Sequence, residues 1–310
     1  MFFRRPSPYL LLTLTVLFWA GNFIVGRAVR GALPPAGLAF WRWAIALLIL
    51  APFAARPVRN EFSEILRHWK LLLMFGLIGV AAFSTLIYVG LTQTTATNAL
   101  LLNSAAPVMI VLIGWWFLGE TITTVQAAGV LVSLAGVGTI IFKGEWAGLL
   151  ALRFTAGDVW VLVAVALWAV YTVLLRYRPS TISPIVFLAT TIAIGVGLNF
   201  LIHVVELLAG AEVHFTSANV AGLVYIGVFP SLASHMFWNR AVAEVGANRA
   251  GLFIHLMPLF GAGMAAAFLG ETLHLYHAGG MLLILAGIGL ATWRRRLPRP
   301  VHVRGDDTNR

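Results

Sequence analysis

Aromatic and polar side chains recur at helical spacing inside apolar stretches of this sequence. Trp19, Asn22 and Phe23 stand at positions i, i+3 and i+4, which places them on one face of a helix. Indole and phenyl rings can stack on a flat substrate, and the amide of Asn22 can hydrogen-bond a polar group. We therefore name them candidate binding residues. The structural alternative, in which these side chains pack helices or contact lipid, stays open.

Arg42 is a cation inside an apolar run, where an uncompensated charge costs at least a few kcal/mol. In an aqueous cavity, its guanidinium would bind a substrate carboxylate through two parallel hydrogen bonds. Alternatively, it would extend to the membrane surface beside Trp41 and Trp43. The sequence leaves both interpretations open.

The later apolar runs hold further candidate binding residues. They are Tyr88, Asn103, Trp168, Tyr171, His235, Asn239 and His255. Hydrogen bonding between helices is the alternative role for the polar members of this set. Asp and Glu are absent from the middle of the apolar runs, whereas proton-driven carriers place a carboxylate there. We therefore expect gradient-driven transport, with a histidine-dependent proton step as the alternative.

Sequence signatures of membrane enzymes are missing. The chain has no His-Glu-x-x-His motif, no Gly-x-Gly-Asp motif and no cysteine, and these motifs supply the metal ligands, acids and nucleophiles of such enzymes. We therefore expect no enzyme activity, no metal and no cofactor. A channel is also disfavoured, because it would need a continuous polar or charged pore, usually with oligomeric symmetry.

The elements that position these residues are predicted to be membrane helices. The chain of 310 residues is 60% hydrophobic and only 10% charged, more apolar than a soluble domain can bury. The predicted spans are 9–29, 36–55, 69–91, 97–118, 123–142, 157–177, 183–208, 218–240, 248–269 and 274–293. The basic residues lie in short segments between these runs, which indicates membrane topology rather than nucleic-acid binding.

The distribution of Lys and Arg predicts the orientation. Sixteen of the 21 basic residues fall on the side of the amino terminus and four on the other side, while Arg42 lies within a span. Because basic residues favour cytoplasmic loops, both termini are predicted to be cytoplasmic, and we expect a multi-pass protein of a bacterial inner membrane. Residues 56–70 are interpreted either as a short interfacial helix or as a solvated loop.

The sequence also contains an internal repeat. An offset of 151 residues aligns Phe117-Leu118-Gly119-Glu120-Thr121 with Phe268-Leu269-Gly270-Glu271-Thr272, and Pro107 with Pro258. An offset of 149 pairs Trp19 with Trp168. Each copy holds five predicted spans, an odd number, so the second copy must be inverted in the membrane. This arrangement predicts a site near the midplane that is exposed alternately to each side, with Pro107 and Pro258 as gating bends.

Five segments follow from this organisation. They are a cytoplasmic amino terminus (1–8), a first repeat (9–142), an extracytoplasmic linker (143–156), a second repeat (157–293) and a basic cytoplasmic tail (294–310). The predicted fold class is therefore an all-α integral membrane protein of ten helices in two inverted five-helix repeats.

Several motifs resemble a known family. They are Trp19-Ala20-Gly21-Asn22-Phe23, Phe40-Trp41-Arg42, and the stretch from Phe237 through Asn248, Arg249 and Pro258 to Phe268-Leu269-Gly270-Glu271. Together they resemble the drug/metabolite transporter superfamily with its paired EamA domains. Within it, the chain looks most like the YddG-type aromatic amino-acid exporters. This resemblance implies ten helices, a central cavity and exported amino acids.

The predicted function is alternating-access export of small neutral or zwitterionic metabolites, with aromatic and other amino acids as the first choice. Export of nucleosides or drug-like compounds is the alternative, because other carriers of the superfamily share the architecture. A doubly anionic substrate would need more cationic groups than Arg42 alone. The expected partners are a small-molecule substrate and membrane lipid, without nucleic acid, and a monomer is the expected state.

Overall fold

The computed structural model describes residues 6–29, 33–94, 96–119, 122–145, 155–269 and 274–292. The predicted carboxy-terminal tail and most of the predicted linker lie outside these ranges, as does the side chain of Phe23. Throughout the described ranges the regular elements are helices.

The first half of the chain contains helices on each side of a short connector, residues 61–68 between α2 and α4. They are α1 (Pro8–Val29), α2 (Pro35–Asn60), α3 (Phe62–Arg67), α4 (Trp69–Gly76), η1 (Leu77–Ala82), α5 (Phe83–Gln93), α6 (Ala96–Asn103), α7 (Ala106–Leu118) and α8 (Thr124–Ile141). The prediction for the second span was too short, because α2 continues beyond residue 55 to Asn60 and includes Pro52 and Pro57. Residues 62–67 of the connector are helical.

The second half repeats this order without a helix in the connector. Its elements are α9 (Ala156–Leu174), η3 (Leu175–Tyr177), α10 (Pro184–Leu208), α11 (Ser217–Ile226), η4 (Gly227–Ala233), α12 (Ser234–Val245), α13 (Ala247–Leu252), η5 (Phe253–Leu256), α14 (Met257–Leu269) and α15 (Leu275–Thr292). Within the described residues, eight helical stretches are long and apolar enough to cross a membrane, and Pro8–Asn22 is a shorter apolar helix.

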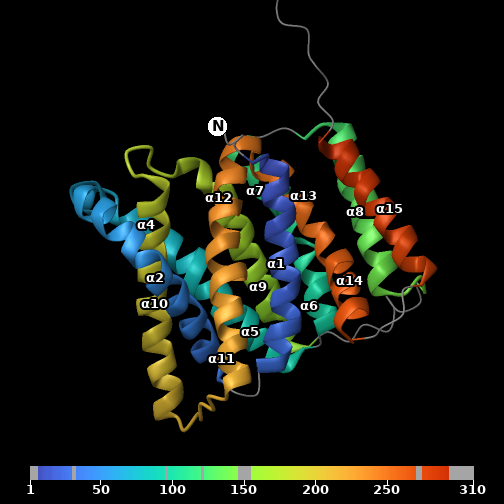
Figure 1. The fold of residues 1–310 in the computed structure, drawn as a ribbon. Helices are drawn as coiled ribbons and strands as arrows, with labels where there is room; N and C mark the ends of the chain where they lie inside the picture. Colours follow the sequence, from blue (N-terminus) through green and yellow to red (C-terminus); the bar gives the residue numbers. More distant parts are fainter. Residues whose placement is uncertain are drawn as a thin grey trace, which may run out of the picture.

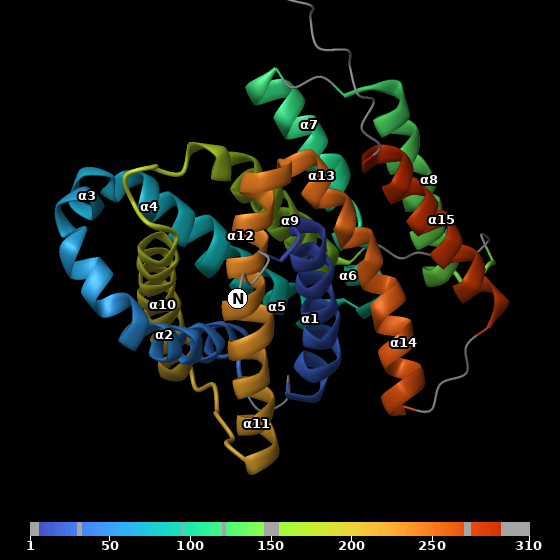
Figure 2. The same ribbon diagram turned by 45° about the horizontal axis from the view of Figure 1, so that its top comes forward.

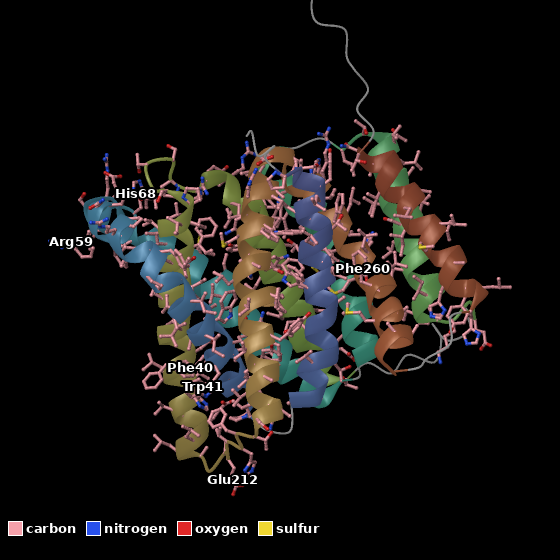
Figure 3. The ribbon with its side chains drawn as sticks, in the orientation of Figure 1. Phe40, Trp41, Arg59, His68, Glu212 and Phe260 are labelled. Atoms are coloured by element: carbon pink, nitrogen blue, oxygen red, sulfur yellow. The ribbon has the colours of Figure 1, made fainter. Side chains whose placement is uncertain are left out.

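The helices lie side by side, with α1, α5, α9 and α12 in the middle (Figure 1). The α2–α10 pair lies at one side of this centre and the α8–α15 pair at the other, in both views (Figures 1 and 2). The first helix begins, and the last described helix ends, at the same face of the bundle. Arg59 and His68 lie near this face, whereas Phe40, Trp41 and Glu212 lie toward the opposite one (Figure 3).

Irregular helical segments recur at corresponding positions of the two halves. The π-helical segments η1 and η4 interrupt corresponding helices, and the turn at Ser104–Ala105 corresponds to the 3₁₀ segment η5. The breaks interrupt the predicted spans 97–118 and 248–269, in which bends at Pro107 and Pro258 are predicted. Pro107 and Pro258 are each the second residue of the helix that follows a break. Proline suits this first turn, because its missing N–H has no intrahelical acceptor there.

Helices α8 and α15 approach each other through glycines. A Cβ atom added to Gly287 would lie 2.5 Å from the carbonyl oxygen of Gly129, and one added to Gly136 would lie 2.7 Å from that of Gly280. Only glycine permits such close backbone contact. The pair therefore packs as small-residue interfaces of membrane helices do.

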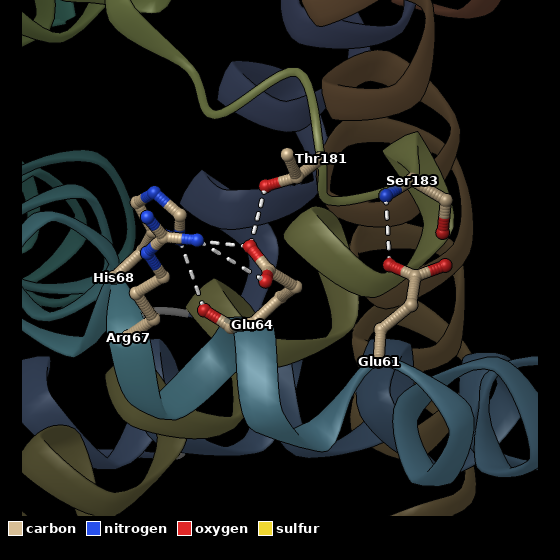
Figure 4. Close-up of polar contacts among 6 residues, drawn as sticks. All are labelled: Glu61, Glu64, Arg67, His68, Thr181 and Ser183. Atoms are coloured by element: carbon tan, nitrogen blue, oxygen red, sulfur yellow. Dashed lines mark hydrogen bonds and ion pairs between the residues drawn. The ribbon is translucent and has the colours of Figure 1, made fainter.

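Helices α2 and α10 cap each other's first turn. The Glu206 carboxylate at the end of α10 accepts hydrogen bonds from the backbone N–H groups of Ala36 (2.9 Å) and Gly37 (3.0 Å) in α2. At the other end, the Glu61 carboxylate after α2 accepts one from the N–H of Ser183 (2.8 Å), directly before α10 (Figure 4). Both carboxylates satisfy free amides where the helix dipole favours negative charge. The two halves are thereby joined at both ends of this helix pair.

We expect Glu206→Gln to lower stability by about 1 kcal/mol or more, because a charge-assisted pair of hydrogen bonds becomes weaker. The measurement is the thermal unfolding midpoint of the purified protein, followed by tryptophan fluorescence. Glu212→Gln is the matched control, because the Glu212 side chain is 79% exposed and pairs only with His214 among the described residues. Equal midpoints for the two variants would contradict the proposed importance of this cap.

Candidate functional site

A cavity lies between side chains of both halves. About 530 Å³ of space free of atoms, including its open side, is bounded by Trp19 and Asn22 from α1, Arg42 from α2, Phe83 and Ile87 from α5, Asn103 from α6, Trp168 from α9, His235 from α12, Ile254 from η5 and Met257 from α14. These side chains come from eight separate helical segments. The cavity is therefore a product of helix packing rather than of any single motif.

Indole rings form one wall of the cavity. The rings of Trp19 and Trp168 meet edge to face with their centroids 5.1 Å apart, and Trp238 and Phe83 each lie 5.1 Å from one of them. Trp19 also donates a hydrogen bond from Nε1 to the carbonyl of Pro230 in η4 (3.1 Å). Since the offset of 149 relates Trp19 to Trp168, their contact joins equivalent residues of the two halves. Such edge-to-face geometry fixes both rings and leaves an aromatic surface toward the cavity.

Arg42 is directed into the protein. Its side chain is 5% exposed, Nε donates to Ser231 Oγ (2.8 Å), and Nη1 donates to Tyr88 Oη (2.8 Å). The guanidinium carbon also lies 5.4 Å from the ring centroid of Trp43. Among the described residues, no ion pair includes Arg42. The structure thus places a cation that lacks an acidic side-chain partner at the cavity wall, rather than at the membrane surface.

A tyrosine–asparagine hydrogen bond occurs in each half, with the two residue types exchanged. Tyr88 on α5 donates to Asn22 Oδ1 on α1 (3.4 Å), and Tyr171 on α9 donates to Asn239 Oδ1 on α12 (2.9 Å). The repeat offsets relate Asn22 to Tyr171 and Tyr88 to Asn239. The same pair of helices is therefore bridged in both halves, although donor and acceptor have changed places. The predicted binding residues Tyr88, Tyr171 and Asn239 are not among the side chains that line the cavity.

His235 lines the cavity, whereas His255 does not. The imidazole of His235 is 2% exposed and lies edge to face with Trp43, at 4.6 Å between centroids. Backbone atoms of Gly79 and Ser231 lie near this ring, but neither ring nitrogen has a hydrogen-bond partner of good geometry. Buried polar atoms of this kind are normally satisfied by protein, water or ligand. His235 is thus suited to receive a polar ligand group.

His255 instead connects three helical segments. Its Nε2 lies 3.1 Å from the carbonyl oxygen of Ser104, and its Nδ1 lies 2.6 Å from Ser133 Oγ. Because a carbonyl only accepts, Nε2 must carry the hydrogen and Nδ1 accepts from the serine hydroxyl. The predicted binding residue His255 therefore bridges the break after α6, helix α8 and η5, away from the cavity lining.

The sequence predictions and the cavity overlap in part. Of the predicted residues, Trp19, Asn22, Arg42, Asn103, Trp168 and His235 line it, while Pro107 and Pro258 begin helices beside the two breaks. Phe83, Ile87, Ile254 and Met257 were missed, because apolar residues in apolar helices stand out neither by composition nor by periodicity. One signal was available: the offset of 151 pairs Asn103 with Ile254.

Comparison with known proteins fits this architecture. The model of the EamA-like transporter family matches residues 6–142 and again residues 155–293. The chain belongs to the EamA-like transporter family. The prediction of an all-helical, multi-pass membrane transporter, rather than an enzyme, is thus confirmed.

Individual relatives cover nearly the whole chain. An uncharacterized transporter of Archaeoglobus fulgidus is 31% identical over 296 residues, which is 93% of this chain and 98% of that protein. A probable terminal-alkyne amino-acid exporter of Streptantibioticus cattleyicolor is 31% identical over 294 residues, covering 93% and 94% of the two chains. A solved crystal structure shares the fold with a TM-score of 0.73 at 20% identity, covering 93% of this chain and 97% of that one.

We expect the Tyr171–Asn239 hydrogen bond to couple α9 and α12. The two single variants Tyr171→Phe and Asn239→Leu should each destabilise the protein by about 1–3 kcal/mol, because each leaves a buried partner unsatisfied. The double variant should recover about 0.5–2 kcal/mol of the summed loss. Thermal unfolding of the four proteins measures this coupling. Strict additivity of the two losses would show that the bond contributes nothing.

Proposed function

We propose that this transporter exports small neutral or zwitterionic metabolites, with aromatic and other amino acids as its main substrates. We place it in a bacterial inner membrane with both termini in the cytoplasm, in agreement with the excess of basic residues on that side. The resemblance to YddG-type exporters and the similarity to a probable amino-acid exporter support this substrate class. No cofactor takes part in the proposed transport.

The observation that carries the proposal is the pairing of Arg42 with an indole wall in one cavity. A substrate carboxylate would neutralise the guanidinium through charge-assisted hydrogen bonds, which are strong where water is excluded. The rings of Trp19 and Trp168 would contact a flat side chain. Asn22 Oδ1 and the unprotonated ring nitrogen of His235 would accept hydrogen bonds from the substrate's ammonium group.

We further propose that transport uses alternating access between two inverted five-helix repeats. The family model matches the two halves separately, and the helix irregularities recur at corresponding positions in them. With α1 and the broken α13–η5–α14 segment added to the eight candidate spans, the chain would cross the membrane ten times. Pro107 and Pro258 stand beside the breaks, where a change of helix direction loses the fewest hydrogen bonds.

Reconstitution of the purified protein into proteoliposomes tests the substrate class. We expect saturable uptake of radiolabelled Phe, Trp, Met and Thr with counterflow, driven by the substrate gradient without an imposed pH gradient. A purine nucleoside and a cationic drug are the comparison substrates. If only these two moved, the amino-acid proposal would fail and the nucleoside or drug alternative would take its place; strict dependence on a pH gradient would favour the histidine-linked proton step.

Removal of the cavity cation tests the binding mode. Arg42→Gln should raise the half-saturating concentration of Phe about tenfold to a hundredfold, because the lost interaction is worth about 1.5–3 kcal/mol. The control is Arg240→Gln, which removes a charge from a 39% exposed side chain paired with Glu244. Unchanged Phe affinity in Arg42→Gln would show that Arg42 does not bind the carboxylate.

A further inference from the structure

The connector between α2 and α4 carries an exposed apolar stripe. It lies near the face where the chain begins, where Arg59 and His68 mark its place (Figure 3). Phe62, Leu66 and Trp69 are 55%, 57% and 52% exposed. Phe62 and Leu66, four residues apart, share one side of α3, and Trp69 is the first residue of α4. The stripe is left uncovered by the described part of the protein, in a position where its aromatic rings can enter a lipid interface.

Basic residues accompany this stripe. Arg56, Arg59, Arg67 and Lys70 are all exposed, and Lys70 lies 5.8 Å from the Trp69 ring centroid. A cationic segment with an adjacent apolar face is the composition of helices that lie on anionic membrane surfaces. Each such cation contributes to attraction by lipid phosphates within a Debye length of the surface.

The repeat does not require this composition. The equivalent connector of the second half, residues 209–216 between α10 and α11, has no helix and no Lys or Arg. The capping carboxylates Glu61 and Glu206 are present at both connectors, whereas the basic residues and the apolar stripe are present at one. The basic residues and the apolar stripe are therefore not needed for the packing of α2 against α10.

The acidic residues of the same connector form hydrogen bonds with the second half of the chain. Glu64 accepts a hydrogen bond from Thr181 Oγ1 (2.8 Å), and Glu61 accepts one from the N–H of Ser183 (2.8 Å) (Figure 4). Glu64 also lies 3.7 Å from Arg67 Nη1 and 3.6 Å from His68 Nδ1. A ligand that binds Arg67 would thus be linked to the residues before α10 through two contacts, Arg67 with Glu64 and Glu64 with Thr181.

We propose that the α2–α4 connector is a binding surface for anionic phospholipid headgroups, and that its occupation is transmitted to α10 through Glu61 and Glu64. The phosphates pair with Arg56, Arg59, Arg67 and Lys70, while Phe62, Leu66 and Trp69 enter the acyl boundary. Lipid binding holds the connector against the membrane, and the two carboxylates hold the start of α10 against the connector. Transport then responds to the anionic lipid content of that leaflet.

Lipid binding is testable without transport. The chain has no native cysteine, so Ser63→Cys carries a single environment-sensitive dye on the exposed side of α3. Phosphatidylglycerol added to the protein in neutral detergent should shift the dye emission saturably, whereas phosphatidylcholine should not. Arg59→Gln/Arg67→Gln should raise the half-saturating lipid concentration about twenty-five-fold, since each of the two headgroup contacts is worth roughly a fivefold factor.

The matched control is Arg240→Gln/Arg249→Gln, which removes the same amount of charge from the second half of the chain, on the same predicted side of the membrane. Its half-saturating concentration should stay within about twofold of the parent. Equal loss in both double variants, or the absence of a saturable dye response, would overturn the proposal. Added sodium phosphate should not compete at low millimolar concentration; competition would indicate a site for free phosphate instead of lipid.

The effect of lipid binding on transport is tested in proteoliposomes, and this experiment rests on the proposed transport function. Phosphatidylglycerol should increase Phe flux of the parent severalfold over pure phosphatidylcholine vesicles. Glu61→Ala/Thr181→Val should keep the dye response but lose this increase, because the hydrogen bonds to Ser183 and Thr181 are removed while all four cations remain. An undiminished increase would refute transmission through these contacts. Absence of flux with an intact dye response would refute the transport function alone.

Discussion

The guanidinium of Arg42 lies among apolar helices and is held by the hydroxyl groups of Ser231 and Tyr88 rather than by a carboxylate. Within a membrane, a cation without an anionic partner needs polar surroundings. Polar side chains provide these surroundings: Ser231 lies in the π-helical segment η4, and Tyr88 donates a hydrogen bond to Asn22. In our proposal, an anionic substrate group completes the charge balance when it enters the cavity, and this requirement gives the cavity its selectivity.

Repeat symmetry explains how these groups come together. Contacts between equivalent residues, such as Trp19 with Trp168 and Ser104 with His255, lie where the two halves meet. The exchange of tyrosine and asparagine between the halves shows that the hydrogen bond between the helices was retained while the residue types were not. Positions at which the two halves carry different residue types therefore indicate where one half has a role that the other lacks. Arg42 has Thr191 as its equivalent at the offset of 149, so one half alone supplies the cation.

The connections between the halves follow the same logic. Mutual capping of α2 and α10 by Glu61 and Glu206 fixes the helix pair at both ends. It has the same pattern in both halves, although the offset of 149 pairs Glu61 with Gly210 and Pro57 with Glu206. The basic and apolar surface of the α2–α4 connector violates it. A symmetric contact serves the architecture common to both halves, whereas a feature found at one face reflects the difference between the two membrane surfaces.

The sequence by itself determined the helical membrane class, the two related halves and six cavity-lining residues, because hydropathy, internal identity and isolated polar residues are all visible along one chain. It left Arg42 between cavity and membrane surface, since a helix of known sequence has no known rotation until its neighbours are packed. The tertiary structure decided that orientation and moved His255 out of the lining. It also supplied Phe83, Ile87 and Met257, whose role depends on which helices converge rather than on their own chemistry.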